Sequence, residues 1–105
     1  MKMKYTVITA AAAALIATAG LSAPALATGK MTCDAGPQAS WKARAELEAA
    51  LVTLGWTVKK SKVDGGCYEV YGTTPEGEQV EAYFHPVTLE KLLVSRRGKV
   101  LFRKQ

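Results

Sequence analysis

The spacing of apolar residues along the chain changes once, near Gly55. Between Trp41 and Leu54, alanines and leucines recur at the 3.6-residue period of a helix and fall on one stripe. That stripe consists of Ala43, Leu47, Ala50, Leu51 and Leu54. The pattern predicts one amphipathic helix of about four turns. Ser40 is expected to be its N-cap, and Gly55 is expected to lie just past its end.

Beyond Gly55, apolar and polar residues alternate with the period of two that is typical of half-buried strands. Clusters of glycine, proline and aspartate divide this region into three predicted strands, Trp56–Val63, Cys67–Thr73 and Glu78–Phe84. After Thr88 two apolar pieces follow, Leu89–Val94 and Val100–Phe102. They favour either a last hairpin or a short helix followed by a strand.

One helix and an antiparallel meander predict a two-layer α+β domain, in which one amphipathic helix packs on a three- to four-stranded antiparallel sheet. Successive side chains of a strand point to opposite faces of the sheet, so the alternation sorts them into two sets. The set expected to face the helix is Trp56, Val58, Tyr68, Val70, Val80, Ala82 and Phe84. The set expected to face away is Glu69, Tyr71, Glu81, Tyr83 and His85, and Cys67 lies on the same side.

The first 27 residues have the order of a secretory signal. Lys2 and Lys4 precede an apolar run over residues 7–20, and the small-residue tripeptide Ala25–Ala27 follows. An uncleaved membrane anchor is the alternative, but a spanning helix needs about 20 apolar residues and this run is shorter. We therefore expect cleavage near Ala27, with the mature protein in the periplasm or secreted.

The mature chain, residues 28–105, is long enough for one small domain without a second core. Loss of the two signal lysines lowers its formal net charge from +5 to +3. From Lys91 to the C-terminus there are six basic residues and no acidic one. This basic tail could contact an anionic surface or an acidic partner, or could simply be a solvated chain end. Nucleic acid is not an expected partner outside the cytoplasm.

Two cysteines, Cys33 and Cys67, are the only ones in the chain. An exported chain with an even number of cysteines and no CxxC or metal-ligand spacing favours a structural disulfide over a redox-active or haem-linked thiol. The bond would tether an irregular arm, residues 28–39, to the domain formed by residues 40–105. Such a small domain often needs a covalent link of this kind.

Three motifs follow one another along the chain: a Thr-Cys pair near the mature N-terminus, the segment LGWTVKKSKVDGGCYEVYG after the helix, and VEAYFHPVT. Together they resemble the PepSY family, in particular its small exported single-domain members. The resemblance extends over Thr32–Thr88. Family members usually continue the last turn as Asp-Pro-x-Thr-Gly, whereas this chain has His85-Pro86-Val87-Thr88-Leu89. The missing glycine leaves the geometry after Thr88 open.

The resemblance implies a helix packed on an antiparallel sheet, which agrees with the pattern of the residues. It also implies a type of role, because PepSY domains occur in propeptides of thermolysin-like metallopeptidases, where they are proposed to inhibit or assist the folding of the peptidase. They also occur as stand-alone exported modules. A fold does not transfer its function by itself.

Residues able to support catalysis or metal binding are few. His85 is the only histidine, and with Glu81 it would supply two ligands four residues apart on one strand, too few and too distant for a metal. Glu69 and Glu81 could become neighbours across two strands, but such pairs are more often solvated than catalytic. We therefore predict no catalytic residue, no cofactor and no metal site.

The outward side chains are the better functional candidates, because exposed tyrosines are enriched at protein interfaces. The candidate interaction face is Glu69, Tyr71, Glu81, Tyr83 and His85. Alternatively, the tyrosines could pack against the arm or the C-terminal segment. The function expected is a non-enzymatic, protein-binding module that modulates a peptidase or another envelope protein. The alternative function is a metal, haem or redox accessory to a membrane electron-transfer partner.

Overall fold

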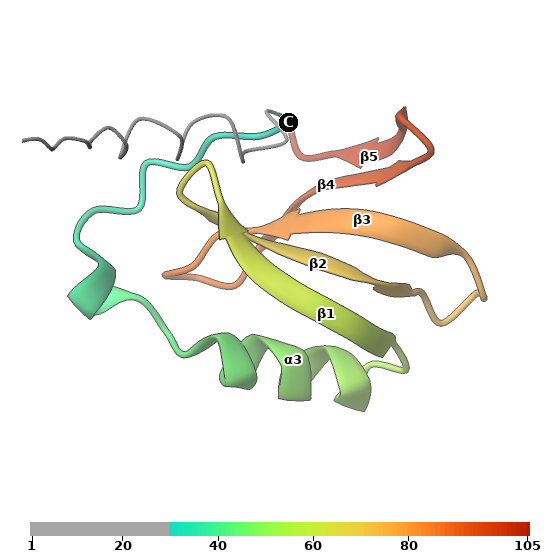
Figure 1. The fold of residues 1–105 in the computed structure, drawn as a ribbon, viewed down its shortest axis with the longest axis horizontal. Coiled ribbons are helices and arrows are strands. Elements are labelled where there is room, and N and C mark those ends of the chain that lie inside the picture. Colours follow the sequence, from blue (N-terminus) through green and yellow to red (C-terminus); the bar gives the residue numbers. More distant parts are fainter. Residues whose placement is uncertain (1–29) are drawn as a thin grey trace, which may run out of the picture.

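The computed structural model of the chain describes residues 30–105, so the predicted signal segment lies outside the described residues. A short 3-10 turn and one helix precede five strands (Figure 1). These elements are η3 (Gln38–Ser40), α3 (Arg44–Thr53), β1 (Thr57–Asp64), β2 (Cys67–Thr73), β3 (Gln79–Phe84), β4 (Lys91–Arg96) and β5 (Lys99–Arg103). No helix within residues 30–105 has the length and apolar character needed to cross a membrane.

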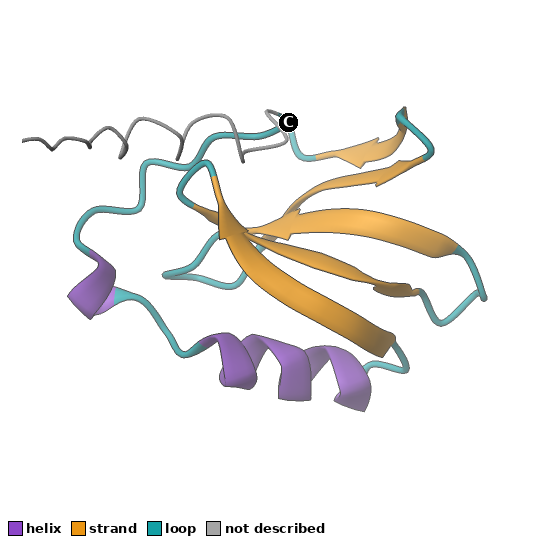
Figure 2. Cartoon of the chain, in the orientation of Figure 1, coloured by secondary structure: helices purple, strands orange, loops and turns teal. Residues whose placement is uncertain are grey.

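The strands form one antiparallel sheet in the order in which they occur in the chain, β1-β2-β3-β4-β5 (Figure 2). The first three agree with the sequence prediction to within a residue at each end. The prediction of three to four strands was too low, because the C-terminal segment is a hairpin. Arg97 and Gly98 have φ values of 52° and 82°. A two-residue turn with both φ values positive joins adjacent antiparallel strands tightly.

The helix begins later than the sequence predicts, and Ser40 is not its N-cap. Ser40 ends the 3-10 turn, where its hydroxyl donates a hydrogen bond to the Pro37 carbonyl at 2.7 Å. The following residues are held to the sheet, since the Lys42 amide donates to the Pro86 carbonyl and the Tyr68 hydroxyl donates to the Lys42 carbonyl. These long-range bonds keep the backbone extended until Ala43, which has no side-chain cap.

The end of the helix is as predicted. Gly55 adopts a φ of 101° directly after the C-cap, and its amide donates to the Val52 carbonyl. Positive φ at this position is the conformation that favours glycine.

One hydrophobic core lies between α3 and the sheet, and it confirms which strand side chains face the helix. Leu47 and Leu51 are the only buried residues of α3. They pack with buried side chains of three strands, β2, β3 and β4, and with four half-buried side chains. The buried set is Tyr68, Val70, Val80, Ala82, Phe84 and Val94, and the half-buried set is Trp41, Trp56, Val58 and Leu89. The rest of the predicted stripe is exposed, because the shortened helix brings only its two central leucines onto the sheet.

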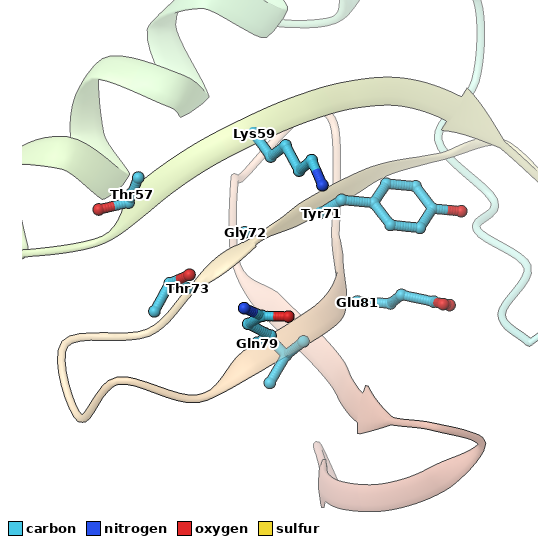
Figure 3. A pocket seen from close by; sticks show the side chains of 8 residues that line it. Thr57, Lys59, Tyr71, Gly72, Thr73, Gln79 and Glu81 are labelled. Carbon is cyan, nitrogen blue, oxygen red and sulfur yellow. The ribbon is translucent and has the colours of Figure 1, made fainter.

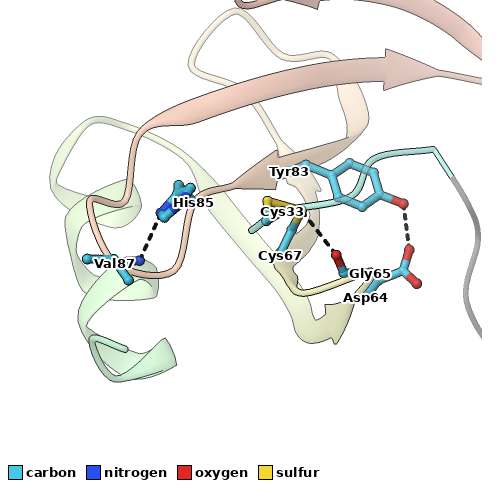
Figure 4. Close-up of a disulfide and its surroundings, with 7 residues drawn as sticks. All are labelled: Cys33, Asp64, Gly65, Cys67, Tyr83, His85 and Val87. Atoms are coloured by element: carbon cyan, nitrogen blue, oxygen red, sulfur yellow. Dashed lines mark hydrogen bonds between the residues drawn. A yellow bond between two sulfur atoms is a disulfide. The ribbon is translucent and has the colours of Figure 1, made fainter. Parts of the chain in front are cut away.

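A second, smaller core lies on the opposite face of the sheet, under the arm. Cys67, Tyr83 and Leu93 are buried there, with Met31 and Cys33 packed against them. Cys33 and Cys67 form the disulfide that the sequence predicts (Figure 4). The Cys33 amide also donates to the Gly65 carbonyl at 2.8 Å. The arm is therefore joined to the β1–β2 turn by a covalent bond and a backbone hydrogen bond.

Two glycines with similar φ offer a matched test of how closely the arm approaches this turn. A Cβ at Gly66 (φ 81°) would lie 2.6 Å from the Cys33 carbonyl oxygen, whereas a Cβ at Gly98 (φ 82°) would meet nothing within 4 Å. Gly98→Ala is expected to lower the free energy of unfolding by about 1–2 kcal/mol, because alanine disfavours positive φ. Gly66→Ala should cost about 1–3 kcal/mol more, because the arm must also shift.

Urea unfolding of both variants and the wild type measures the difference between the two glycines. Equal losses for Gly66→Ala and Gly98→Ala would show that the arm does not press on the turn.

Candidate functional site

The open face, meaning the face of the sheet opposite α3, carries polar and aromatic side chains in two rows across the strands. Strand pairing places the row nearer the disulfide at Lys62, Glu69, Tyr83 and Leu93. The farther row is Lys60, Tyr71, Glu81 and Ser95. Four residues of the outward set predicted from alternation, Glu69, Tyr71, Glu81 and Tyr83, therefore lie on one face.

The row nearer the disulfide is closed to solvent by the arm. Glu69 and Tyr83 are both 0% exposed. The Tyr83 hydroxyl donates to the buried carboxylate of Asp64 at 2.7 Å (Figure 4). The Lys30 ammonium, on the arm, lies 3.3 Å from a carboxylate oxygen of Glu81. Of the two alternatives left open for the outward tyrosines, Tyr83 packs under the arm, and Glu69 is covered with it, because alternation assigns a face without saying what covers it.

Glu69 is a buried carboxylate whose negative charge is only weakly compensated by nearby cations and hydrogen-bond donors. Its nearest cation is the Lys62 ammonium at 3.8 Å, and no hydrogen bond of ordinary length from the described residues reaches either oxygen. Burial raises the pKa of Glu69, and the charges of Asp64 and Glu81 add to the rise, whereas the Tyr71 hydroxyl and Lys62 oppose it. Burial, the hydrogen bond of its hydroxyl to Glu69 and the charges of Glu69, Glu81 and Asp64 raise the pKa of Tyr71 to about 12. Tyr71 therefore remains a neutral hydroxyl at physiological pH.

At the other end of the open face, which no described residue of the arm lines, there is a shallow depression of about 370 Å³ (Figure 3). Its lining comes from three neighbouring strands and comprises Thr57, Lys59, Tyr71, Gly72, Thr73, Gln79, Val80 and Glu81. The Lys60 ammonium lies 4.7 Å above the centre of the Tyr71 ring, within the range of a cation–π contact. Tyr71 and Glu81 thus stand at the boundary between the covered and the uncovered parts of the face.

His85 does not line this depression. Its Nδ1 accepts a hydrogen bond from the Val87 amide at 3.2 Å, within its own turn (Figure 4). Residues 30–105 contain no group of three or more potential metal ligands. Of the five candidate residues, the structure therefore leaves Tyr71 and Glu81 together at an accessible surface.

The turn after His85 explains how the chain manages without the glycine expected at position 89. Leu89 adopts a φ of 64°, in the left-handed region, and its amide donates to the His85 carbonyl at 2.7 Å. A leucine in this conformation costs about 1–2 kcal/mol relative to an ordinary one. Its side chain packs against the main core, which offsets that cost.

Several residues of the site were not singled out from the sequence. Thr57, Lys59, Thr73 and Gln79 line the depression, and Asp64 is buried under the arm. Thr73 and Gln79 could have been predicted from the alternation. They pair with each other two residues along the strands from the Tyr71–Glu81 pair, and so lie on the same face. Lys59 could not, because a bulge between Val58 and Lys60 interrupts the alternation of β1.

Comparison with known protein families matches residues 8–93 of the chain to the peptidase propeptide and YPEB domain. The chain belongs to the PepSY family. PepSY domains of the propeptide type are generally non-catalytic and are typically extracellular or periplasmic. No curated protein and no solved structure is significantly similar to this PepSY chain.

The buried Glu69 of this PepSY domain gives a prediction for the dependence of stability on pH. Folding raises the pKa of Glu69 above the ordinary value of 4.5, so the folded state favours the protonated carboxyl. The stabilisation from this protonation is fully present below pH 4.5. It is lost as the pH rises through the folded-state pKa. Glu69→Gln removes the titration. The free energy of unfolding of the variant, relative to the wild type, is therefore expected to increase as the pH rises from below 4.5 toward neutral.

Urea unfolding of both proteins at several pH values provides the measurement. A difference that stays constant or decreases over this range would contradict the assignment of Glu69 as a destabilising buried carboxylate.

Proposed function

We propose that this PepSY chain is a non-enzymatic, exported protein-binding module that modulates a peptidase or another envelope protein. The observation that carries the proposal is the uncovered part of the open face, where a tyrosine, a glutamate and a lysine surround a shallow polar depression. Membership of the PepSY family supports a partner of this kind, since the family takes its description from peptidase propeptides.

The depression suits contact with a protein surface better than it suits a reaction. It is wide and shallow, and its polar groups are threonine, glutamine, lysine, tyrosine and glutamate side chains. Glu69 and Glu81 are the pair of carboxylates considered for acid–base chemistry, but they differ in access to solvent. Glu69 is covered by the arm, whereas Glu81 is half-exposed. A substrate could not reach both at once.

Tyr71 is the expected centre of the contact. The ring is held by the Lys60 ammonium on one side, so it is already ordered before a partner arrives. Ordered aromatic side chains lose little conformational entropy on binding and are frequent among the residues that dominate interfaces. Its hydroxyl is neutral at physiological pH and can both donate and accept a hydrogen bond.

The test is capture of a partner from an envelope extract by the purified protein, followed by measurement of the affinity by calorimetry. Tyr71→Ala is expected to weaken binding by about tenfold or more, the usual effect at an interface centre. Val52→Ala is the matched control, since Val52 is exposed on α3, on the other side of the sheet. It should leave the affinity unchanged.

Capture of no partner would contradict the proposal. So would a partner whose affinity is the same for Tyr71→Ala and the wild type.

A further inference from the structure

The arm is attached firmly at one residue and loosely before it. Cys33 is joined to the β1–β2 turn by its disulfide with Cys67 (Figure 4), and its amide donates to the Gly65 carbonyl at 2.8 Å. The preceding residues 30–32, here called the arm end, form no backbone hydrogen bond with any other described residue. The arm end can therefore lift about Cys33 while the disulfide stays intact.

Two side-chain contacts hold the arm end on the sheet. Met31 packs against the second, smaller core under the arm. The Lys30 ammonium lies 3.3 Å from a carboxylate oxygen of Glu81, and both of these side chains are 32% exposed. An ion pair that solvent reaches to this extent contributes little to stability. The closed position of the arm end therefore depends mainly on the packing of Met31 and on what lies beneath the arm.

Beneath the arm lies Glu69, a group that burial leaves poorly solvated. Glu69 is 0% exposed, and neither of its carboxylate oxygens has a hydrogen-bond partner of ordinary geometry among the described residues. Its nearest cation is the Lys62 ammonium, at 3.8 Å. A buried polar group without such a partner is destabilising, and contact with water removes the penalty. Opening of the arm end would give Glu69 this contact.

The penalty for burying Glu69 depends on pH. An ionised carboxylate is much more costly to bury than a neutral carboxyl group. Burial accordingly raises the pKa of Glu69 above its ordinary value of 4.5. The free energy that favours solvation of Glu69 therefore increases as the pH rises from below 4.5 toward neutral.

The titratable and charged groups around Glu69 come from three strands and the arm. They are Lys60, Lys62 and Asp64 on β1, Tyr71 on β2, Glu81 and Tyr83 on β3, and Lys30 on the arm. Two of them, Asp64 and Glu81, are carboxylates whose charges favour the neutral form of Glu69 in addition to the effect of burial. The strand β4 adds only the uncharged Leu93 and Ser95 to this face.

The opposite face of the sheet contributes no charge to the surroundings of Glu69. It carries α3 and an apolar groove between α3 and the β4–β5 hairpin. The groove is lined in part by Leu54, Trp56, Leu101 and Phe102. The sheet itself separates these elements from the arm.

We propose that the arm end is a pH-sensitive cover, which stays closed while Glu69 is protonated and opens more often once Glu69 is ionised. Because the disulfide fixes Cys33, the opening is local and transient, and the closed arm remains the major state. Opening would also separate Lys30 from Glu81, a residue of the depression on the open face. The inference concerns the arm alone, so it does not depend on the partner contact proposed at Tyr71.

The ion pair between Lys30 and Glu81 would give the opposite dependence on pH. Protonation of Glu81 at low pH would release Lys30, so an arm end held chiefly by this pair would open as the pH falls. The sign of the pH dependence therefore distinguishes control by Glu69 from control by Glu81.

The experiment measures how fast hydrogen peroxide oxidises the Met31 thioether of the full chain to the sulfoxide. Peroxide transfers one oxygen atom to sulfur and leaves as water, with no net uptake or release of a proton. Peptide mass spectrometry separates Met31 from the other two methionines, Met1 and Met3. A short peptide with the sequence around Met31 gives the uncovered rate at each pH. The ratio of the two rates reports how often the arm end opens.

In the wild type, this ratio should rise by about threefold to tenfold as the pH increases from below 4.5 to neutral, since one pKa unit corresponds to a factor of about ten. Glu69→Gln keeps the size of the side chain and removes its charge, so the ratio should stay low at every pH. Glu81→Gln is the matched control on the same face. It loses the pair with Lys30, so its ratio should be higher throughout and should still rise with pH.

Trp41 and Trp56 pack against the main core and report whether the rest of the domain stays folded. Their emission should not change over the same pH range. Four results would overturn the proposal. These are a ratio that does not change with pH, a ratio that rises as the pH falls, an equal rise in Glu69→Gln and the wild type, or a rise that accompanies a change in tryptophan emission. The second would assign control of the arm end to the Lys30–Glu81 pair, and the fourth would indicate unfolding of the whole domain.

Discussion

The bond between Cys33 and Cys67 determines which part of the open face meets solvent. It joins residues 34 positions apart, and closing a loop of that length stabilises a folded chain by about 3–4 kcal/mol in the chain-entropy model. That is close to the whole stability expected of so small a core. The bond also has a local effect, because it holds the arm over Tyr83 and Glu69. Without the arm, a buried carboxylate and a buried tyrosine would face water.

The two faces of the sheet are thus each covered only in part, by different means. On one face α3 covers the first strands and leaves an apolar groove beside the β4–β5 hairpin. On the other face the arm covers the row nearer the disulfide and leaves a polar depression beyond it. Both uncovered regions extend to the end of the sheet where β2 and β3 join, the end away from the Cys33–Cys67 bond. Each face of the sheet therefore keeps an uncovered surface that is lined by both polar and apolar side chains.

The sequence predicts the parts of this structure that depend on local periodicity and misses those that depend on distant contacts. Alternation identifies the side chains that face α3, because a strand that is buried on one side must place its apolar residues there. It leaves open whether Glu69 and Tyr83 are covered, since the cover is an irregular arm without a pattern of its own. Likewise Ser40 has the composition of an N-cap, but hydrogen bonds from Tyr68 and to Pro86 delay the helix. The exposed groove depends on a bulge at Leu101, which no alternation predicts.

The central claim is that the disulfide keeps the arm over one part of the open face, and hydroxyl-radical footprinting read by peptide mass spectrometry tests it most directly. Two buried tyrosines serve as probe and control, Tyr83 under the arm and Tyr68 in the core beneath α3. In the wild type both should be protected. In Cys33→Ala, labelling of Tyr83 should rise several-fold while Tyr68 stays protected. Equal protection of Tyr83 in both proteins, or an equal rise at Tyr68, would contradict the account.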